Sequence, residues 1–533
     1  MGFLDFVKSE EKRASSPEED GVQRFQSGPV EVEDVGDELH RGMKPRQLSA
    51  YGKSLAPGRM AIAGAIGTGL IIGSGSALKN GGPGSILIGY LLMGFIVYIV
   101  MVALGEMGAW LPHKKSFSGY ASRFVDPAFG FATGWNYFFK YVIVLPNNLT
   151  VTGIIIAYWR PDLNVSIWIV VFGVLIIALN LVHVSFFGEA EFWMSLLKAL
   201  VICALILICF IIALGGGPDH TRRGFYYWQN PGAFNEYLVD GDTGRFLGVW
   251  ASIVQATFAY LGTELVGVAF GETPDPRKNV PKAVKQTLMR ICFFYVIGVI
   301  ALGMAVPYNN ERLISASGGK TSGAASPFVI AAELAGIPKL DSVINAFLLV
   351  FTVSAANSDI YLASRTIWAL AKEGQAPAIF HHTNKNGVPV AAVGISSLFI
   401  LLGFMNITSS ASTVFGYFVS LVTVFGALNW ISILVSYHFM LQGMKAQGIP
   451  RSVMPYRNPL LPWGAYLAFA ITVLVIIFNG FAAFMPFKID KFMTSYIGIP
   501  VYLINILWWK VFKKTKMVKP EEMDLQTGRR DVQ

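Results

Sequence analysis

The chain has 533 residues, of which 53% are hydrophobic and only 14% are charged. Soluble domains carry roughly a quarter charged residues, so this composition excludes an ordinary soluble domain and favours a protein embedded in a membrane. The net charge of +9 does not indicate a nucleic-acid partner, because the basic residues lie in short loops between apolar blocks.

The first 45 residues are polar and acidic and contain no apolar core of a signal peptide. We expect residues 1–45 to form a disordered cytosolic arm, because they hold too few apolar residues to build a core.

Apolar blocks follow, each about 20 residues long, which is the length that crosses roughly 30 Å of hydrocarbon. They predict a membrane domain over residues 46–512 and a cytosolic tail over 513–533. About twelve segments are expected, at 60–78, 84–110, 128–158, 166–184, 192–214, 246–270, 287–307, 341–371, 389–406, 412–441, 463–485 and 493–512.

Nearly every loop that follows an even-numbered segment is basic, so we expect these loops, and both termini with them, to lie in the cytosol. The residues that carry this signal include Lys114, Lys115, Arg277, Lys278, Lys372, Lys445, Arg451, Lys510 and Lys513.

Segment 1 contains five glycines between Ala63 and Gly75. Glycine at this density indicates a break in the helix. A break in lipid is tolerated where the released backbone groups line a cavity, and the N–H groups at a helix start suit a carboxylate. Close packing of small residues is the alternative interpretation.

Segment 6 has a second interruption, at Gly262, with Glu264 close behind it. Two interrupted helices, each the first of a set of five, predict an inverted repeat with a binding site between segments 1 and 6.

Among the charged residues inside apolar segments, we take Lys140, Lys198, Glu264 and Glu106 as candidates. Each costs roughly 2.5–3.5 kcal/mol on membrane-insertion scales, so such residues are functional candidates. For Glu106 we favour a structural role near a helix end that reaches water.

Five ordered motifs run through the membrane region, at Gly64–Gly69, Tyr260–Glu264, Gly271–Lys278, Ser326–Val329 and Ser354–Arg365. Together they resemble the fungal amino-acid permeases of the amino acid-polyamine-organocation superfamily. Five further segments lie at Phe138–Tyr141, Pro146–Thr150, Phe187–Trp193, Gly215–Pro218 and Tyr496–Tyr502. These segments are similar to the dicarboxylic branch of that family.

This resemblance implies an all-α, LeuT-like fold with a five-plus-five inverted repeat, two extra helices and proton-driven uptake. It implies that the backbone at Ala65, Ile66, Gly67, Thr68 and Gly69 binds the substrate carboxylate. It also implies that carbonyls near Phe258, Ala259 and Leu261 bind the ammonium group, with Tyr260 lining the cavity.

The resemblance also bears on coupling and selectivity. Lys198 lies where sodium-coupled relatives hold a cation, so Lys198 and Glu264 are the proton-coupling candidates, and a permanent ion pair is the alternative for Lys198. Many relatives have a glutamate where this chain has Asn148, and Lys140 lies about two helical turns earlier. Both features favour acidic substrates, unless Lys140 reaches the interface or pairs with Glu264.

The sequence therefore predicts a plasma-membrane symporter of amino acids and protons that prefers glutamate and aspartate, without enzyme activity, metal or cofactor. A general or neutral permease and a non-transporting amino-acid sensor are the alternatives. Residues 50–59 depart from the family pattern, either as a real insertion or as a gene-model error.

Overall fold

The computed structural model describes residues 67–113, 115–182, 184–218, 220–268, 270, 275–317 and 326–529, with the backbone alone for 184–190, 192 and 315–317. The N-terminal arm, residues 50–59, Ala65 and Ile66 lie outside the described residues.

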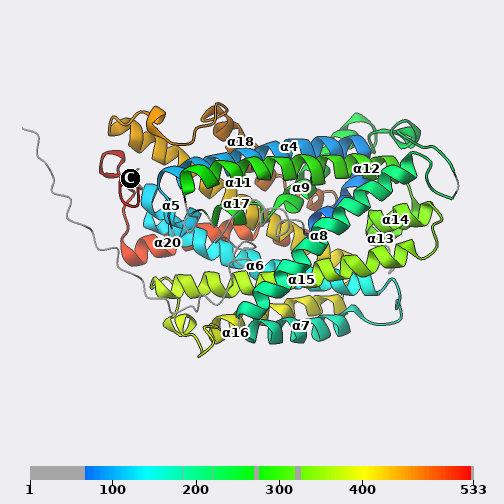
Figure 1. Cartoon of the computed structure of the whole chain (residues 1–533), viewed down its shortest axis with the longest axis horizontal. Coiled ribbons are helices and arrows are strands. Elements are labelled where there is room, and N and C mark those ends of the chain that lie inside the picture. The colour runs from blue at the N-terminus through cyan, green and yellow to red at the C-terminus, as the bar shows by residue number, and fades with distance from the viewer. Residues whose placement is uncertain are drawn as a thin grey trace, which may run out of the picture. The chain divides into compact units, whose positions relative to one another are not determined.

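Helices make up the secondary structure of the described residues, which contain no β-strand (Figure 1). The helices of the first half are η1 (Gly69–Gly73), α4 (Ser74–Trp110), α5 (Ser116–Phe124), α6 (Pro127–Ile156), α7 (Val165–Leu181), α8 (Val184–Ala213), η2 (Trp228–Gly232), α9 (Gly241–Tyr260) and α10 (Leu265–Val268). Those of the second half are α11 (Pro276–Arg290), η4 (Ile291–Ile297), α12 (Gly298–Ala305), α13 (Glu311–Ser317), α14 (Pro327–Leu334), α15 (Leu340–Lys372), η5 (Ala378–His381), α16 (Val390–Leu398), η6 (Phe399–Ile407), α17 (Ala411–Ala446), η7 (Arg451–Val453), α18 (Trp463–Ile477), η8 (Phe481–Ala483), α19 (Ile489–Tyr496), α20 (Gly498–Lys513) and η9 (Pro520–Glu522).

Each predicted apolar segment overlaps one of these helices, but their lengths do not establish twelve spans. The described residues hold nine helices long and apolar enough to cross a membrane, or ten if the bent pair α19 and α20 forms one span. Predicted segments 1 and 2 run together in one 42-residue stretch, Gly69–Trp110. A kink at Gly82, where φ is +81°, precedes Pro83 and marks the junction between them.

Helix α6 runs through the interior of the bundle. In its most apolar stretch 83% of the residues are buried, against 44% in α8, one face of which lies outside. Helices α4 and α9 pack together along their length, and α15 and α17 both pack on α6. The interior is therefore formed by helices far apart in sequence.

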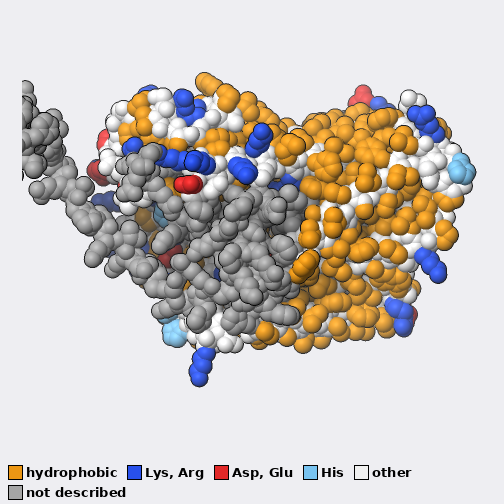
Figure 2. Space-filling model, viewed as in Figure 1, with side chains coloured by type: hydrophobic (Ala, Val, Ile, Leu, Met, Phe, Trp, Pro, Cys, Tyr) orange, Lys and Arg blue, Asp and Glu red, His pale blue; other side chains and the backbone are white. Residues whose placement is uncertain are grey.

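The exposed surface of the helix bundle is apolar. Leu200 and Leu207 on α8 and Val174 on α7 are each 60–63% exposed. Figure 2 shows a broad hydrophobic face where the described surface is in view, with lysine and arginine side chains toward its ends. Such a surface is stable against lipid chains, because water would hydrate it poorly.

The chain after α20 packs against the ends of several helices. The Val518 amide donates to the Val125 carbonyl (2.9 Å), and Arg123 Nε donates to the Asp524 carbonyl (2.7 Å). Gln447 Nε2 donates to the Met523 carbonyl (2.7 Å), and the side chains of Met523 and Leu525 are buried. This docked tail thus joins α5, α6 and α17.

Candidate functional site

The predicted interruption of segment 6 is confirmed. Helix α9 ends at Tyr260, and Gly262 follows with φ of +94°, a conformation that side-chain-bearing residues adopt at a cost. The Thr263 hydroxyl donates to the Tyr260 carbonyl (2.8 Å), and the short helix α10 begins at Leu265. The backbone therefore leaves the helix within the bundle interior.

The start of the segment 1 helix lies directly against this break. A Cβ atom added to Gly69 would lie 2.5 Å from Ala259 Cα, closer than real contacts allow. Gly67 is non-helical and Thr68 precedes η1, so the N–H groups of the first helical turn follow at once. The structure thus brings Gly69 close to Phe258 and Ala259, whereas a Cβ added to Gly67 would have no atom within 4 Å.

The end of α9 offers carbonyl groups. The Phe258 carbonyl accepts from the Leu261 amide (3.2 Å), whereas no described backbone amide outside the helices donates to the carbonyls of Ala259 or Leu261. Tyr260 is buried, and its hydroxyl donates to the Tyr90 carbonyl of α4 (2.9 Å). Its side chain therefore links the two helices.

A chain of three buried polar side chains extends from the segment 1 helix into the bundle. The Thr68 hydroxyl donates to Asn148 Oδ1 (2.9 Å), and Asn148 Nδ2 donates to Asp359 Oδ2 (2.7 Å). These residues come from the start of segment 1, from α6 and from α15, and we call them the Thr68–Asn148–Asp359 chain. Asn148 thus lies next to the helix start, as its assignment to the substrate site requires.

Lys140 and Glu264 form a buried ion pair, which was one alternative for Lys140 in the sequence analysis. The Glu264 carboxylate also accepts from the Gly262 amide (3.1 Å) and from Trp430 Nε1 (3.3 Å). Lys140 Nζ lies 4.8 Å from the centre of the Tyr141 ring. The pair therefore fixes the turn that interrupts segment 6 to α6.

Lys198 is buried on α8, and its Nζ lies 3.6 Å from a carboxylate oxygen of Glu191. The other Glu191 oxygen accepts from the Ser354 hydroxyl of α15 (3.2 Å). This is the ion-pair alternative for Lys198.

The expectation that Glu106 reaches water is wrong, because its side chain is fully buried. Arg451 Nη2 lies 2.5 Å from its carboxylate, and the Tyr437 hydroxyl (2.7 Å) and the Asn458 amide (2.8 Å) donate to it. These partners replace water, and the structural role expected for Glu106 agrees with them.

Three buried charged residues were missed as candidates. Asp359 and Glu191 lie in motifs that carry the family resemblance, and a carboxylate inside an apolar run was a signal for Asp359. Arg290 is fully buried at the end of α11, and its Nη2 donates to the Thr263 hydroxyl (2.9 Å) beside the break. Arg290 lies near the start of predicted segment 7, next to the basic loop that was interpreted as a topology signal.

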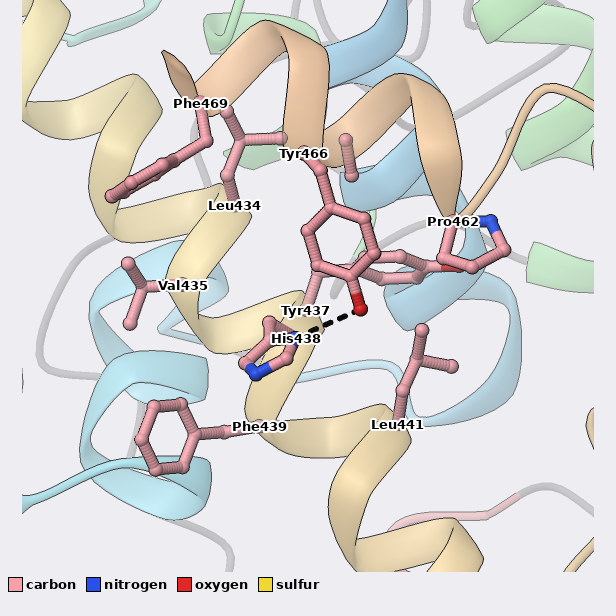
Figure 3. Close-up of a pocket in the computed structure, with 10 residues that line it drawn as sticks. Leu434, Val435, Tyr437, His438, Phe439, Leu441, Pro462, Tyr466 and Phe469 are labelled. Carbon is pink, nitrogen blue, oxygen red and sulfur yellow. Dashed lines mark hydrogen bonds between the residues drawn. The ribbon is translucent and has the colours of Figure 1, made fainter. Parts of the chain in front are cut away.

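A pocket of about 220 Å³ lies elsewhere, between α17 and α18 (Figure 3). Its lining is apolar apart from Tyr437, His438 and Tyr466, and the His438 ring and the Tyr466 hydroxyl point toward each other at 3.2 Å. No residue of the segment 1 or segment 6 break lines it. It is therefore separate from the candidate substrate site.

A helix start and a helix break that meet beside buried polar groups, inside a bundle with an apolar exterior, are features of transporters with the LeuT-like fold. A solved manganese transporter of Eremococcus coleocola has this architecture: it aligns with a TM-score of 0.54 at 15% identity, over 90% of this chain and 98% of that one.

The chain belongs to the amino acid permease family, whose sequence pattern matches residues 59–521. It is 51% identical over 521 residues to an uncharacterised amino-acid permease of Schizosaccharomyces pombe, covering 98% of each chain. It is 45% identical to the dicarboxylic amino acid permease of Saccharomyces cerevisiae, over 93% of this chain and 81% of that one. A proline-specific permease of Emericella nidulans is 40% identical, over 92% of this chain and 89% of that one.

Proposed function

We propose that this permease carries amino acids into the cell across the plasma membrane together with protons, with both its termini in the cytosol, and that it prefers glutamate and aspartate. The observation that carries the proposal is the close approach of Gly69 to Ala259 at the break in segment 6. An amino-acid zwitterion needs donors for its carboxylate and acceptors for its ammonium group. A helix start and a helix end supply both without a buried net charge.

The acidic preference is supported by the side chain at position 148. Asn148 has no charge to repel the side-chain carboxylate of glutamate, whereas a glutamate at this position would. The dicarboxylic permease among the relatives agrees with this preference. The proline-specific relative supports the alternative, a neutral or general permease.

Lys140 contributes indirectly under this proposal. Its ion pair with Glu264 holds the segment 6 turn, and a substrate carboxylate that draws Lys140 away must compete with Glu264. Lys198 and Glu264 remain the predicted proton-coupling residues, each already in an ion pair.

The function is tested by uptake of labelled glutamate in a yeast host that lacks its own amino-acid permeases. We expect uptake that unlabelled aspartate inhibits more strongly than glutamine, which matches glutamate in shape but not in charge. A protonophore should abolish uptake, and replacement of sodium by choline should not change it. Equal inhibition by glutamine and aspartate would favour the general permease, and binding without uptake would favour the sensor.

Replacing Asn148 tests the origin of the preference. Asn148→Glu should reduce glutamate uptake at least about tenfold more than glutamine uptake, because one unfavourable charge contact of about 1.4 kcal/mol is a factor of ten. Asn148→Gln adds the same length without charge and serves as the control. Equal losses of both substrates in Asn148→Glu would remove this residue from the selectivity argument.

A further inference from the structure

A carboxylate that the proposed function does not use lies in the interior of α15. The side chain of Asp359 is buried, and Asn148 Nδ2 donates to it. No described lysine, arginine or histidine forms an ion pair with it, whereas Glu106, Glu191 and Glu264 each pair with a cation. A buried carboxylate without a cation is costly when ionised, so Asp359 is the one of these four best suited to take up a proton.

The charges that act on Asp359 come from two of the helices packed on α15. They are Lys140 on α6 and Lys198 and Glu191 on α8, and Tyr141 of α6 is a further titratable neighbour. The two lysines already have carboxylate partners. Lys140 and Lys198 therefore lower the free-energy cost of ionising Asp359, but part of that cost remains.

The other helices packed on α15 contribute little charge beside Asp359. Helices α7 and α16 contain no charged residue. Glu333 of α14 pairs with Arg312, and the backbone of His381 in η5 contacts Trp368 near the C-terminal end of α15. When Asp359 gains or loses a proton, the charges on these other helices therefore stay nearly the same.

The direction of the hydrogen bonds links this charge to the substrate site. An ionised carboxylate can only accept, so Asn148 must turn its N–H₂ toward Asp359 and its carbonyl oxygen toward Thr68. The Thr68 hydroxyl then donates its one hydrogen to the Asn148 carbonyl oxygen. It has none left for a substrate carboxylate at the start of the segment 1 helix.

We propose that Asp359, rather than the paired Lys198 or Glu264, binds the co-transported proton and that Asn148 transmits its protonation state to Thr68, which deepens the proton coupling of the proposed function and rests on it. When Asp359 gains a proton, its O–H donates to the Asn148 carbonyl and the amide turns over. The Asn148 N–H₂ then donates to the Thr68 oxygen, and the Thr68 hydrogen is released to the substrate carboxylate. One proton enters, no covalent bond other than its O–H forms, and an anionic substrate meets one negative charge fewer.

Two transport modes of the purified full-length protein in liposomes separate this coupling from binding. Counterflow exchanges labelled for unlabelled glutamate and needs no net proton movement, whereas net accumulation needs the pH gradient. In the wild type, lowering the external pH should raise the apparent glutamate affinity at least about fivefold, the lower end of usual coupling factors. In Asp359→Asn, counterflow should persist without pH dependence, and gradient-driven accumulation should be lost.

Asp341→Asn is the matched control, because Asp341 lies in the first turn of the same helix and bonds Tyr158 instead of Asn148. It should keep the pH dependence of the wild type. Thr68→Val removes only the hydroxyl and keeps the branched shape, so it should remove the pH dependence of glutamate affinity with Asp359 intact. This second variant keeps the test decisive if Asp359→Asn does not fold.

Three results would overturn the inference. Gradient-driven accumulation by Asp359→Asn would place the proton elsewhere and leave the proposed symport standing. Loss of counterflow in folded Asp359→Asn would make Asp359 a binding residue, for instance for the substrate ammonium group. A wild type whose accumulation ignores the pH gradient would refute the symport itself.

Discussion

Gly69 is the residue at which the proposed site tolerates the least change. Any side chain there would meet the backbone of Ala259, which cannot move away as a flexible side chain would. Gly394 in α16 has no atom within 4 Å of an added Cβ and is also helical, so it provides a matched control.

We therefore predict that Gly69→Ala lowers glutamate uptake severely while Gly394→Ala leaves it unchanged. The alanine at 69 forces the start of the segment 1 helix away from the end of α9 and displaces the N–H groups from the proposed position of the substrate carboxylate. Uptake rates normalised to surface-localised protein measure the effect. Wild-type transport by Gly69→Ala would show that the two helices do not need this close contact.

The Lys140–Glu264 pair yields a second prediction at the residue scale. Lys140→Met leaves the Glu264 carboxylate buried without its cation, which should cost about 3–5 kcal/mol of stability. Adding Glu264→Gln removes the unpaired charge and should restore most of this loss. Thermal unfolding of the purified single and double variants checks the prediction, and additive losses would mean that the pair is not coupled.

At the scale of elements, the turn after α9 depends on the backbone of Gly262. An added Cβ would meet nothing within 4 Å, so the positive φ alone opposes other residues. Gly262→Ala should destabilise the turn by about 1–2 kcal/mol, the cost of a left-handed conformation for an alanine. Chemical denaturation against wild type measures this, and a stability gain would show that the turn relaxes to helical dihedrals.

The helices and the break in segment 6 could be predicted from the sequence, whereas the partners of the buried charged side chains could not. Apolar length and glycine spacing predicted the helices and the break at Gly262, because both depend on local composition. An ion pair of Lys198, without a named partner, and the pairing of Lys140 with Glu264 remained alternatives, since side-chain partners depend on helix rotation. Asp359 carried the signal of a carboxylate inside an apolar run, but its contact with Asn148 could not be predicted, because it depends on the packing of α15 on α6.

At the scale of the whole described part, one joint between the bundle and the tail depends on pH. Asp126 caps α6 by accepting from the Ala128 amide (2.7 Å), and it also accepts from Lys510 (2.9 Å) and Thr515 (2.8 Å). Burial opposes its ionisation, but the hydrogen bonds from Lys510, Ala128 and Thr515 outweigh this and hold the pKa of Asp126 below its usual value.

Because the folded state lowers this pKa, Asp126 stabilises the joint fully above its unfolded value of about 3.9 and loses that contribution as the pH falls through the folded value. We predict that acidification from pH 7 to 5 leaves this contribution unchanged and that further acidification removes it. Asp126→Asn should lower the melting temperature at pH 7. The difference in melting temperature between the variant and the wild type should become smaller below about pH 4. An undiminished difference at low pH would contradict the assignment.

The docked tail has a consequence for biosynthesis. Arg123 and Asp524 lie 401 positions apart, and Trp110 Nε1 donates to the Leu525 carbonyl 415 positions away (3.3 Å). The ribosome makes α5 and α6 long before the residues that cover their ends, so these contacts close only after every helix has been inserted. Tail docking is thus a late step of maturation, and a translation product that stops after α20 would leave uncovered the apolar surface against which Met523 and Leu525 are buried.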